Sequence, residues 1–131
     1  MMKPTIESGT HLAESADLSG SHFMDVNLED AVFENVNLSR AKFHNVNFSD
    51  IIVTAAQVGG ADFQHVGLPD DPSTRGAKQR PLRFRECDLN DSTLEDCDLS
   101  DVEIVDCDIS GLKINGVLVE DLLEKHEGDL E

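Results

Sequence analysis

Tryptophan and tyrosine are absent from this chain of 131 residues, and so is any long hydrophobic run. No stretch approaches the roughly 20 consecutive apolar residues that a membrane-spanning helix needs. The first 14 residues lack the basic start and apolar run of a secretory signal. We therefore expect a cytoplasmic protein with no membrane partner.

The motifs of common catalytic and metal sites are also missing. The sequence contains no serine nucleophile elbow, no glycine-rich phosphate loop and no HExxH pair. Five histidines fall in different phases of the pattern described below, and three cysteines lie ten residues apart, unlike the close pairs of a zinc site. We therefore expect a protein that is not an enzyme and has no cofactor or bound metal.

Basic residues are scarce and concentrated in one place. The chain has 10 Lys and Arg against 27 Asp and Glu, a net charge of -17. Half of the basic residues fall within 75–85, which contains no acidic residue. We call this segment the basic strip; its cations are Arg75, Lys78, Arg80, Arg83 and Arg85. Direct nucleic-acid binding is not expected for so acidic a chain, except through this strip.

What the chain does have is an apolar residue at every fifth position. From residue 18 the central residues are Leu18, Phe23, Leu28, Phe33, Leu38, Phe43, Phe48, Val53, Val58, Phe63 and Leu68. A second run, in a different register, has the central residues Phe84, Leu89, Leu94, Leu99, Ile104, Ile109, Ile114 and Val119. In both runs a second, mostly smaller residue precedes each central residue by two positions. A period of five fits neither a helix nor a strand alone, so we expect short extended segments separated by corners, wound into a solenoid.

The units ADLSG (16–20), VNLED (26–30), AVFEN (31–35), VNLSR (36–40) and AKFHN (41–45) resemble the pentapeptide-repeat family, as do CDLND from Cys87 and CDLSD from Cys97. The resemblance implies an all-β fold, a right-handed quadrilateral β-helix with four pentads per coil. Residues twenty apart would then stack about 4.8 Å from one another. Phe23, Phe43 and Phe63 would form one internal ladder.

The expected organisation has three parts. Residues 1–15 form an N-terminal tail or cap, residues 16–119 the β-helix, and residues 120–131 a C-terminal cap. The β-helix is interrupted by a loop at 69–81, an excursion of about 11 extra residues flanked by prolines. Nineteen pentads give about five coils. After Asn115-Gly116, Val119, Leu122, Leu123 and His126 share one face of a short helix ending near Gly128.

A coil with four sides also predicts on which wall the cysteines and two outward apolar residues lie. Cys87 and Cys107 would stack on one wall, close enough for a disulfide by distance alone, whereas core packing is the alternative for all three thiols. Val32 and Ile52 project outward on one wall, where the loop either covers them or joins them in a partner site.

A rigid scaffold for protein–protein interaction is the function we expect. Its contact surfaces would be the basic strip, with Val32 and Ile52, and an acidic wall made of Glu86, Asp88, Asp106 and Asp108. The alternative is a DNA-mimicking regulator of DNA gyrase, because the resemblance extends to quinolone-resistance pentapeptide proteins. The C-terminal cap would close the last coil or pair with its twin in a homodimer.

Overall fold

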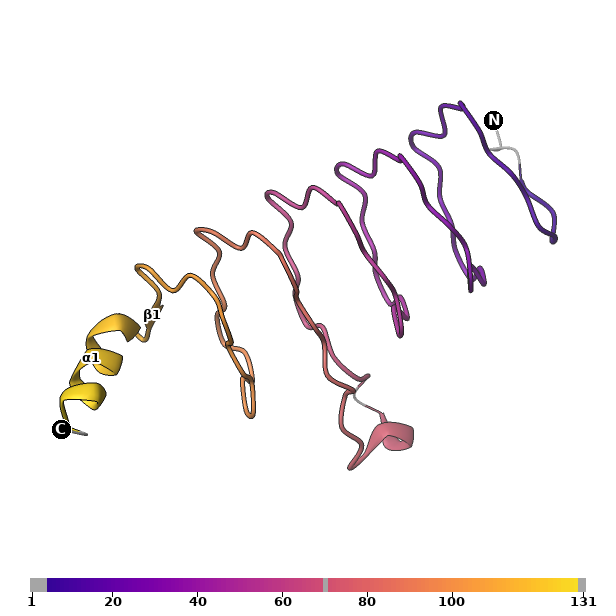
Figure 1. Ribbon diagram of the computed structural model, residues 1–131. Helices are drawn as coiled ribbons and strands as arrows, with labels where there is room; N and C mark the ends of the chain where they lie inside the picture. The colour runs from indigo at the N-terminus through magenta and orange to yellow at the C-terminus, as the bar shows by residue number, and fades with distance from the viewer. Residues whose placement is uncertain (1–4, 70, 130–131) are drawn as a thin grey trace. The chain divides into compact units, whose positions relative to one another are not determined.

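The computed structural model describes residues 5–69 and 71–129 and contains little regular secondary structure (Figure 1). Its elements are a 3₁₀ helix η1 (Pro72–Thr74), strands β1 (Lys113–Ile114) and β2 (Val117–Leu118), and helix α1 (Val119–Asp129). Among the described residues no helix has the length and apolar character needed to cross a membrane. The rest of the chain is built from short segments and corners.

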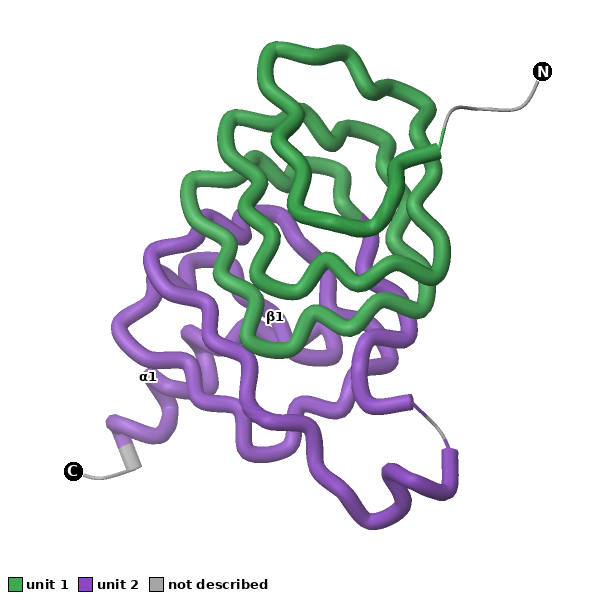
Figure 2. The backbone as a smooth tube through the Cα atoms, turned by 90° about the vertical axis from the view of Figure 1, so that its right-hand side faces the viewer, with its two compact units in different colours: residues 1–61 green, residues 62–131 purple. Residues whose placement is uncertain are grey.

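The chain divides into two compact units, Met1–Ala61 and Asp62–Glu131 (Figure 2). In each unit the backbone winds through angular coils. The expected division at residues 15, 69–81 and 119 is not tested by this partition and stays a prediction.

Every corner of the winding has one residue in the left-handed region. In the first run the residue two positions after each central residue has positive φ from Gly20 to His65, and Ser15 begins the series. The second run repeats this from Glu86 to Gly111. The non-glycine corners have φ of 50 to 63°, and most of them are Asp or Asn, the residues that tolerate this conformation best. The acidic and amide residues at this phase therefore have a backbone role.

The corners alternate between two kinds, so the true structural period is ten residues. In the closed turns a backbone N–H donates to the carbonyl of the central residue three positions earlier, at 2.9 to 3.2 Å. The closed turns follow Leu18, Leu28, Leu38, Phe48, Val58, Leu89, Leu99 and Ile109. Positive φ at the third residue alone is the type II pattern. The intervening corners, which we call open bends, have no such hydrogen bond in the described part of the chain.

A side-chain hydrogen bond accompanies seven of the eight closed turns. The turn after Val58, which Gln57 precedes, closes without it, and Asp62 precedes the open bend at Phe63. In seven closed turns an Asp or Asn precedes the central residue, and its Oδ1 accepts from the backbone N–H two positions later at 2.9 to 3.0 Å. These residues are Asp17, Asn27, Asn37, Asn47, Asp88, Asp98 and Asp108. This Asx turn holds the chain in the turn conformation. Open bends have residues such as Val32, Lys42 or Glu103 at the same position.

The C-terminal segment is the best-packed part of the described chain. Asn115 and Gly116 both have positive φ, 49° and 80°, which is the type I′ geometry of a two-residue hairpin. The hairpin pairs Lys113 with Leu118 and Ile114 with Val117. Helix α1 follows directly, as predicted from the apolar spacing, and extends one residue beyond Gly128. Val119, expected to centre the last pentad, instead begins this helix.

Two hydrogen bonds join α1 to the last closed turn. The N–H of Val119 donates to the carbonyl of Leu112 at 3.0 Å, and the N–H of Gly111 donates to Oε1 of Glu120 at 2.6 Å. Ile109, Leu112, Leu118 and Val119 are half-buried here. The described C-terminal helix is therefore positioned to act as a cap, as expected.

The expected close stacking of coils is not what the structure has. None of the described residues is buried, and the central residues are about half exposed, for example Phe23 at 54%. Within the described residues, β1 and β2 are the only paired strands. Within each unit, Cα atoms a full coil apart lie more than 8 Å from one another almost throughout, well beyond the 4.8 Å spacing of a strand ladder. Hydrogen-bonded strand ladders and burial of the central side chains both require coils about 4.8 Å apart.

Aromatic packing differs from the expectation for the same reason. Among the described residues the only ring pair is Phe43–Phe48, with centroids 5.3 Å apart and an interplanar angle of 64°. These residues are neighbours along the coil. Phe23 and Phe43, predicted to stack a coil apart, do not form such a pair.

Candidate partner-binding surfaces

The loop leaves the winding where the Asx hydrogen bond cannot form. At the Leu68 pentad the Asx position is occupied by Gly67, which has no side-chain acceptor, and the donor position by Pro69, which has no N–H. The next backbone bond instead runs from the N–H of Asp71 to the carbonyl of Pro69, at 3.1 Å. The winding then resumes with an open bend after Phe84, so the alternation continues in phase across the loop.

The loop has internal structure. Asp71 is the N-cap of η1, and its side chain accepts from the N–H of Ser73 at 2.8 Å. The Thr74 hydroxyl donates to the carbonyl of Pro69, and the N–H of Ala77 donates to the carbonyl of Thr74 at 2.9 Å. Gly76, with φ of 77°, reverses the chain after the helix. These bonds fix the backbone from which the basic strip begins.

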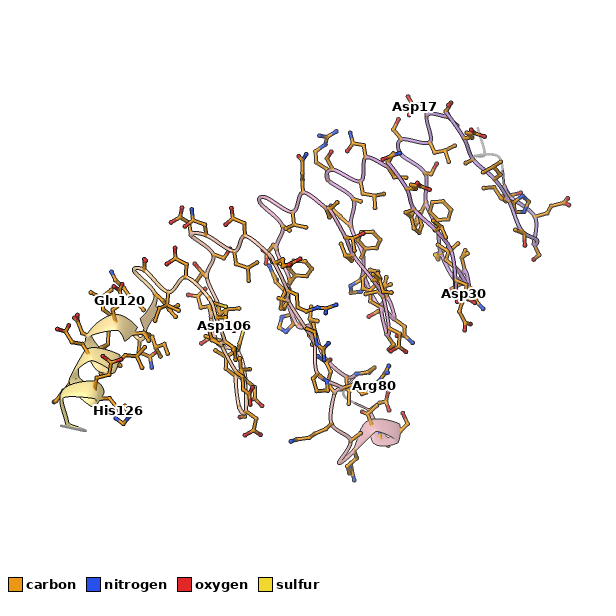
Figure 3. All side chains as sticks on the ribbon, viewed as in Figure 1. Asp17, Asp30, Arg80, Asp106, Glu120 and His126 are labelled. Carbon is orange, nitrogen blue, oxygen red and sulfur yellow. The ribbon has the colours of Figure 1, made fainter. Side chains whose placement is uncertain are left out.

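All five cations of the basic strip are exposed. Arg75 is the C-cap of η1, and the strip then continues from Ala77 to Arg85 without a helix, turn or bend. Figure 3 shows Arg80 on the looped-out segment. Arg83 and Arg85 flank the central residue Phe84. The structure thus presents the strip as one continuous segment, partly loop and partly coil.

One carboxylate of the winding lies within electrostatic reach of the strip. Hydrogen bonds from the hydroxyl and N–H of Ser100 lower the pKa of Asp98, and the positive charge of Lys78 lowers this pKa further. Lys78 and Asp98 both belong to the second unit. The strip therefore already interacts with a carboxylate of its own chain.

The four residues of the acidic wall have two different backbone roles. Asp88 and Asp108 are Asx-turn residues that accept from the N–H groups of Asn90 and Ser110. The pKa of Asp108 is lowered by hydrogen bonds from the side chain and backbone of Ser110. Glu86 and Asp106 are left-handed corner residues with φ of 53° and 52°. Figure 3 shows Asp106 on the coil.

The two apolar residues expected beside the loop belong to the first unit. Val32 and Ile52 are 82% and 85% exposed, among the most exposed apolar side chains of the described chain. The loop belongs to the second unit, and each unit is described separately. The proposed meeting of the loop with these residues stays a prediction.

The cysteines are free and exposed, and they share one geometry. The thiols of Cys87, Cys97 and Cys107 each donate to the carbonyl two residues earlier, at 3.2, 3.3 and 3.2 Å. Among residues 5–69 and 71–129, no group of three His, Cys, Asp or Glu side chains is arranged to hold a metal ion.

The profile of pentapeptide repeats matches this chain with eight copies, over residues 14–50 and 83–119. Together these segments make up more than half of the 131 residues. The chain belongs to the pentapeptide-repeat family. No curated protein and no solved structure matches it. Pentapeptide repeats imply a β-helix.

The repeat backbone continues beyond the matched pentapeptide segments. Residues 51–82 lie between them, yet Ala55, Gly60 and His65 keep the left-handed corners, and a closed turn follows Val58. The loop is therefore an insertion after a pentapeptide winding that reaches at least to His65.

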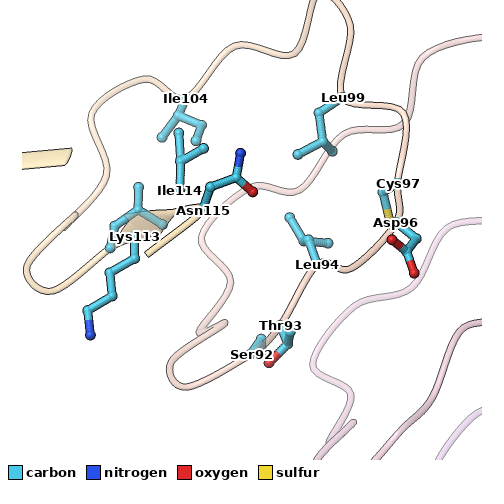
Figure 4. Close-up of a pocket in the computed structure, with 11 residues that line it drawn as sticks. Ser92, Thr93, Leu94, Asp96, Cys97, Leu99, Ile104, Lys113, Ile114 and Asn115 are labelled. Carbon is cyan, nitrogen blue, oxygen red and sulfur yellow. The ribbon is translucent and has the colours of Figure 1, made fainter. Parts of the chain in front are cut away.

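A cavity of about 560 Å³ lies in the second unit of this pentapeptide-repeat chain (Figure 4). Residues exactly one expected coil apart line it together: Ser92 with Leu112, Thr93 with Lys113, and Leu94 with Ile114. Leu99 and Ile104 complete its apolar side. Asp96, Cys97 and Asn115 also line it, and the pairing of residues twenty apart agrees with the expected coil of four pentads.

The Asx-turn residues are the structurally important set that the sequence analysis missed. The signal was present, because Asp or Asn precedes every second central residue from Leu18 to Phe48 and again from Leu89 to Ile109. A comparison at ten-residue spacing would have found it, whereas the five-residue comparison mixed the two kinds of corner.

Proposed function

We propose that this pentapeptide-repeat protein is a non-enzymatic scaffold that binds a protein partner through the structured basic strip and the acidic wall. The observation that supports this most is the loop. It is inserted without disturbing the alternation of turns, it has its own cap and hydrogen bonds, and it carries three of the five clustered cations. Protruding loops held by a regular framework often carry recognition.

The framework we propose is a right-handed quadrilateral β-helix of about five coils in its closed form. The exposed area of the chain is 14506 Å². A compact monomer of 14.4 kDa would expose about 6,800 Å². Stacking the coils would remove most of this difference, because the half-exposed central residues would face one another. The paired lining of the cavity supports four pentads per coil.

The scaffold proposal is tested with a loop deletion designed from the repeat phase. Removing residues 71–81 leaves Pro69-Asp70 directly before Leu82, so that Phe84 follows Leu68 at the normal spacing of five. The deletion removes Arg75, Lys78 and Arg80 but preserves the order of closed turn and open bend. Affinity capture with immobilised wild type and deletion variant, compared by mass spectrometry, should identify proteins that only the wild type retains. Identical captured sets would refute a loop-dependent scaffold.

The second candidate is a DNA-mimicking regulator of DNA gyrase, favoured by the 16 acidic and two basic residues from Glu86 onward. The test is a gyrase supercoiling assay with and without a fluoroquinolone. The matched variant is Glu86→Gln with Asp88→Asn, Asp106→Asn and Asp108→Asn, since Asn keeps both the turn acceptor and the corner preference. Inhibition or drug protection that the variant lacks would favour mimicry over the loop-based scaffold.

Helix α1 has a second proposed role besides capping, which is pairing with its twin in a homodimer. Leu122 and Leu123 support this, because they remain 51% and 47% exposed on the helix. Sedimentation equilibrium with wild type and Leu122→Ser should show a dimer that the variant weakens. A monomer at every accessible concentration would leave capping as the only role.

A further inference from the structure

The basic strip has a regular spacing that limits what it can bind. Lys78 and Arg80 are two residues apart, as are Arg83 and Arg85, in a segment without turns or bends. In extended backbone, side chains two residues apart lie on the same face about 6.6 Å from each other. An extended peptide with an acidic residue at every second position has the same spacing. Arg80 and Arg83 are three residues apart, so in extended backbone the two pairs face opposite sides and one such peptide can match one pair at a time.

We propose that the basic strip docks an extended acidic segment of a partner protein, whose carboxylates at alternate positions pair with Arg83 and Arg85, while Lys78 adds positive charge to the strip. This inference rests on the proposed scaffold function and names the chemistry of its partner. Arginine forks match carboxylates in a bidentate arrangement, and clusters of arginine are a recurring means of recognising acidic motifs.

The surroundings of the strip favour a short acidic peptide over nucleic acid. Phe84 is the single aromatic residue in the sequence of the strip and is a central residue of the winding, so the strip has no row of aromatic side chains on which successive bases could stack. The remaining chain is strongly acidic and would repel a long polyanion that extends beyond the strip. A short segment can stay within the region of positive charge, because charges farther away are screened within about 8 Å at physiological salt.

The positive charge of Lys78 contributes to lowering the pKa of one carboxylate of the chain itself, that of Asp98. Lys78 acts on Asp98, so a docking peptide has to compete with Asp98 for this lysine. Asp108 occupies the equivalent turn and has its own serine partner, but Lys78 does not act on it. Replacing Asp98 by Asn should therefore favour peptide binding more than the same change at Asp108.

The test is fluorescence anisotropy of a labelled peptide in which Glu and Ser alternate, titrated with the full chain. The wild type should bind it, and added salt should weaken binding. The double variant Arg83→Gln, Arg85→Gln should lower the affinity roughly threefold to thirtyfold, as expected for two exposed ion pairs. The control Lys42→Gln, Lys125→Gln removes the same charge outside the strip and should change the affinity less than about twofold. Asp98→Asn should raise the affinity more than Asp108→Asn.

Three outcomes would overturn the inference: no binding of the Glu peptide, equal loss in both double variants, or tighter binding of single-stranded DNA than of the peptide. A peptide in which Gln replaces Glu should not bind. If the peptide fails but the 71–81 deletion still loses a captured protein, the acidic-segment inference is wrong and the scaffold proposal stands. If the deletion loses nothing, the scaffold proposal itself fails.

Discussion

Single residues set the shape of each corner in this chain. In seven of the eight closed turns an Asp or Asn before the central residue accepts a backbone N–H, and a left-handed residue two positions after the central residue redirects the chain. Both effects are local and need no buried core. The corners therefore remain regular even though no described side chain is buried.

Asn37 provides a direct test of the Asx turn. Asn37→Ala removes the acceptor for the N–H and hydroxyl of Ser39 and should lower the free energy of unfolding by about 0.5–1 kcal/mol. Asn37→Asp keeps the acceptor and should be nearly neutral, because Asp occupies this position in four other closed turns. Urea denaturation measures both. Equal destabilisation by Ala and Asp would contradict the role of the acceptor.

Acid should weaken the turns that use Asp but spare those that use Asn. Hydrogen bonds from the following serine lower the pKa of Asp17, Asp98 and Asp108 in the folded chain. The unfolded chain then binds more protons, so the contribution of these turns is complete above the ordinary carboxyl pKa of about 3.9 and is lost as pH falls through the lowered values. NMR pH titration of the N–H groups of Ser19, Ser100 and Ser110 should show this. Ser39 and Ser49, which bond to Asn, should show no matching step.

Two neighbouring glycines allow the effect of backbone conformation to be measured separately from the effect of available space at one corner. Gly60 has φ of 79° and Gly59 does not have positive φ, and a Cβ at either would meet no atom within 4 Å. Gly60→Ala should therefore lower the free energy of unfolding by about 1–2 kcal/mol through backbone strain alone. Gly59→Ala should be neutral or slightly stabilising. If thermal denaturation gives equal effects for the two, the left-handed corner does not limit stability.

At the scale of elements, the C-terminal hairpin and α1 contact one another. The bond from Gly111 to Glu120 ties the helix to the last closed turn. Glu120→Ala should lower the free energy of unfolding by about 1 kcal/mol, whereas Glu120→Gln keeps an acceptor and should cost less. Hydrogen exchange at Gly111 is the direct measurement. Unchanged protection in Glu120→Ala would show that this bond does not dock the helix.

The elements also show how far the sequence could be interpreted. The apolar residue at every fifth position predicted the corners, and the apolar spacing after Gly116 predicted α1, because both patterns are determined within a few residues. The hairpin was missed although Asn115-Gly116 is a strong signal for it, because Ile114 and Val119 continued the five-residue repeat on both sides. The wide distance between successive coils was not predictable from the five-residue repeat. Periodicity says which way a side chain points and contains no information on the distance to the next coil.

The candidate surfaces were predictable as charges but not as structures. The clustering of cations in 75–85 is evident from the sequence, and their exposure follows from their charge. The η1 cap at Asp71 and the action of Lys78 on Asp98 depend on where the loop folds, which no local pattern determines. Asp88 and Asp108 appeared to be surface charges, yet their oxygens are turn acceptors.

At the scale of the whole molecule, the proposed closed form makes a prediction about the cysteines. If coils of twenty residues stack about 4.8 Å apart, the Cα atoms of Cys87 and Cys107 come within disulfide range, while Cys97 lies on the opposite wall. Mild oxidation with diamide should then produce an intramolecular Cys87–Cys107 bond, detected by non-reducing peptide mapping. Cys97→Ser should not affect it. Random pairing among the three thiols would argue against closed coils.

The alternation of closed turns and open bends restricts how the length of this chain can change. Removing one pentad would shift the ten-residue alternation by half a period. Every later Asx-turn residue would then lie at an open bend, and every later open-bend residue would lie at a closed turn. In the proposed coil of four pentads, removing two pentads would keep the turns in phase but move all later surfaces to the opposite wall. Only a change of four pentads preserves both, whereas an insertion that leaves and re-enters between two corners, as residues 71–81 do, preserves everything around it. Duplication and loss in such a gene are therefore tolerated in whole coils, and new surfaces are most easily acquired as loops.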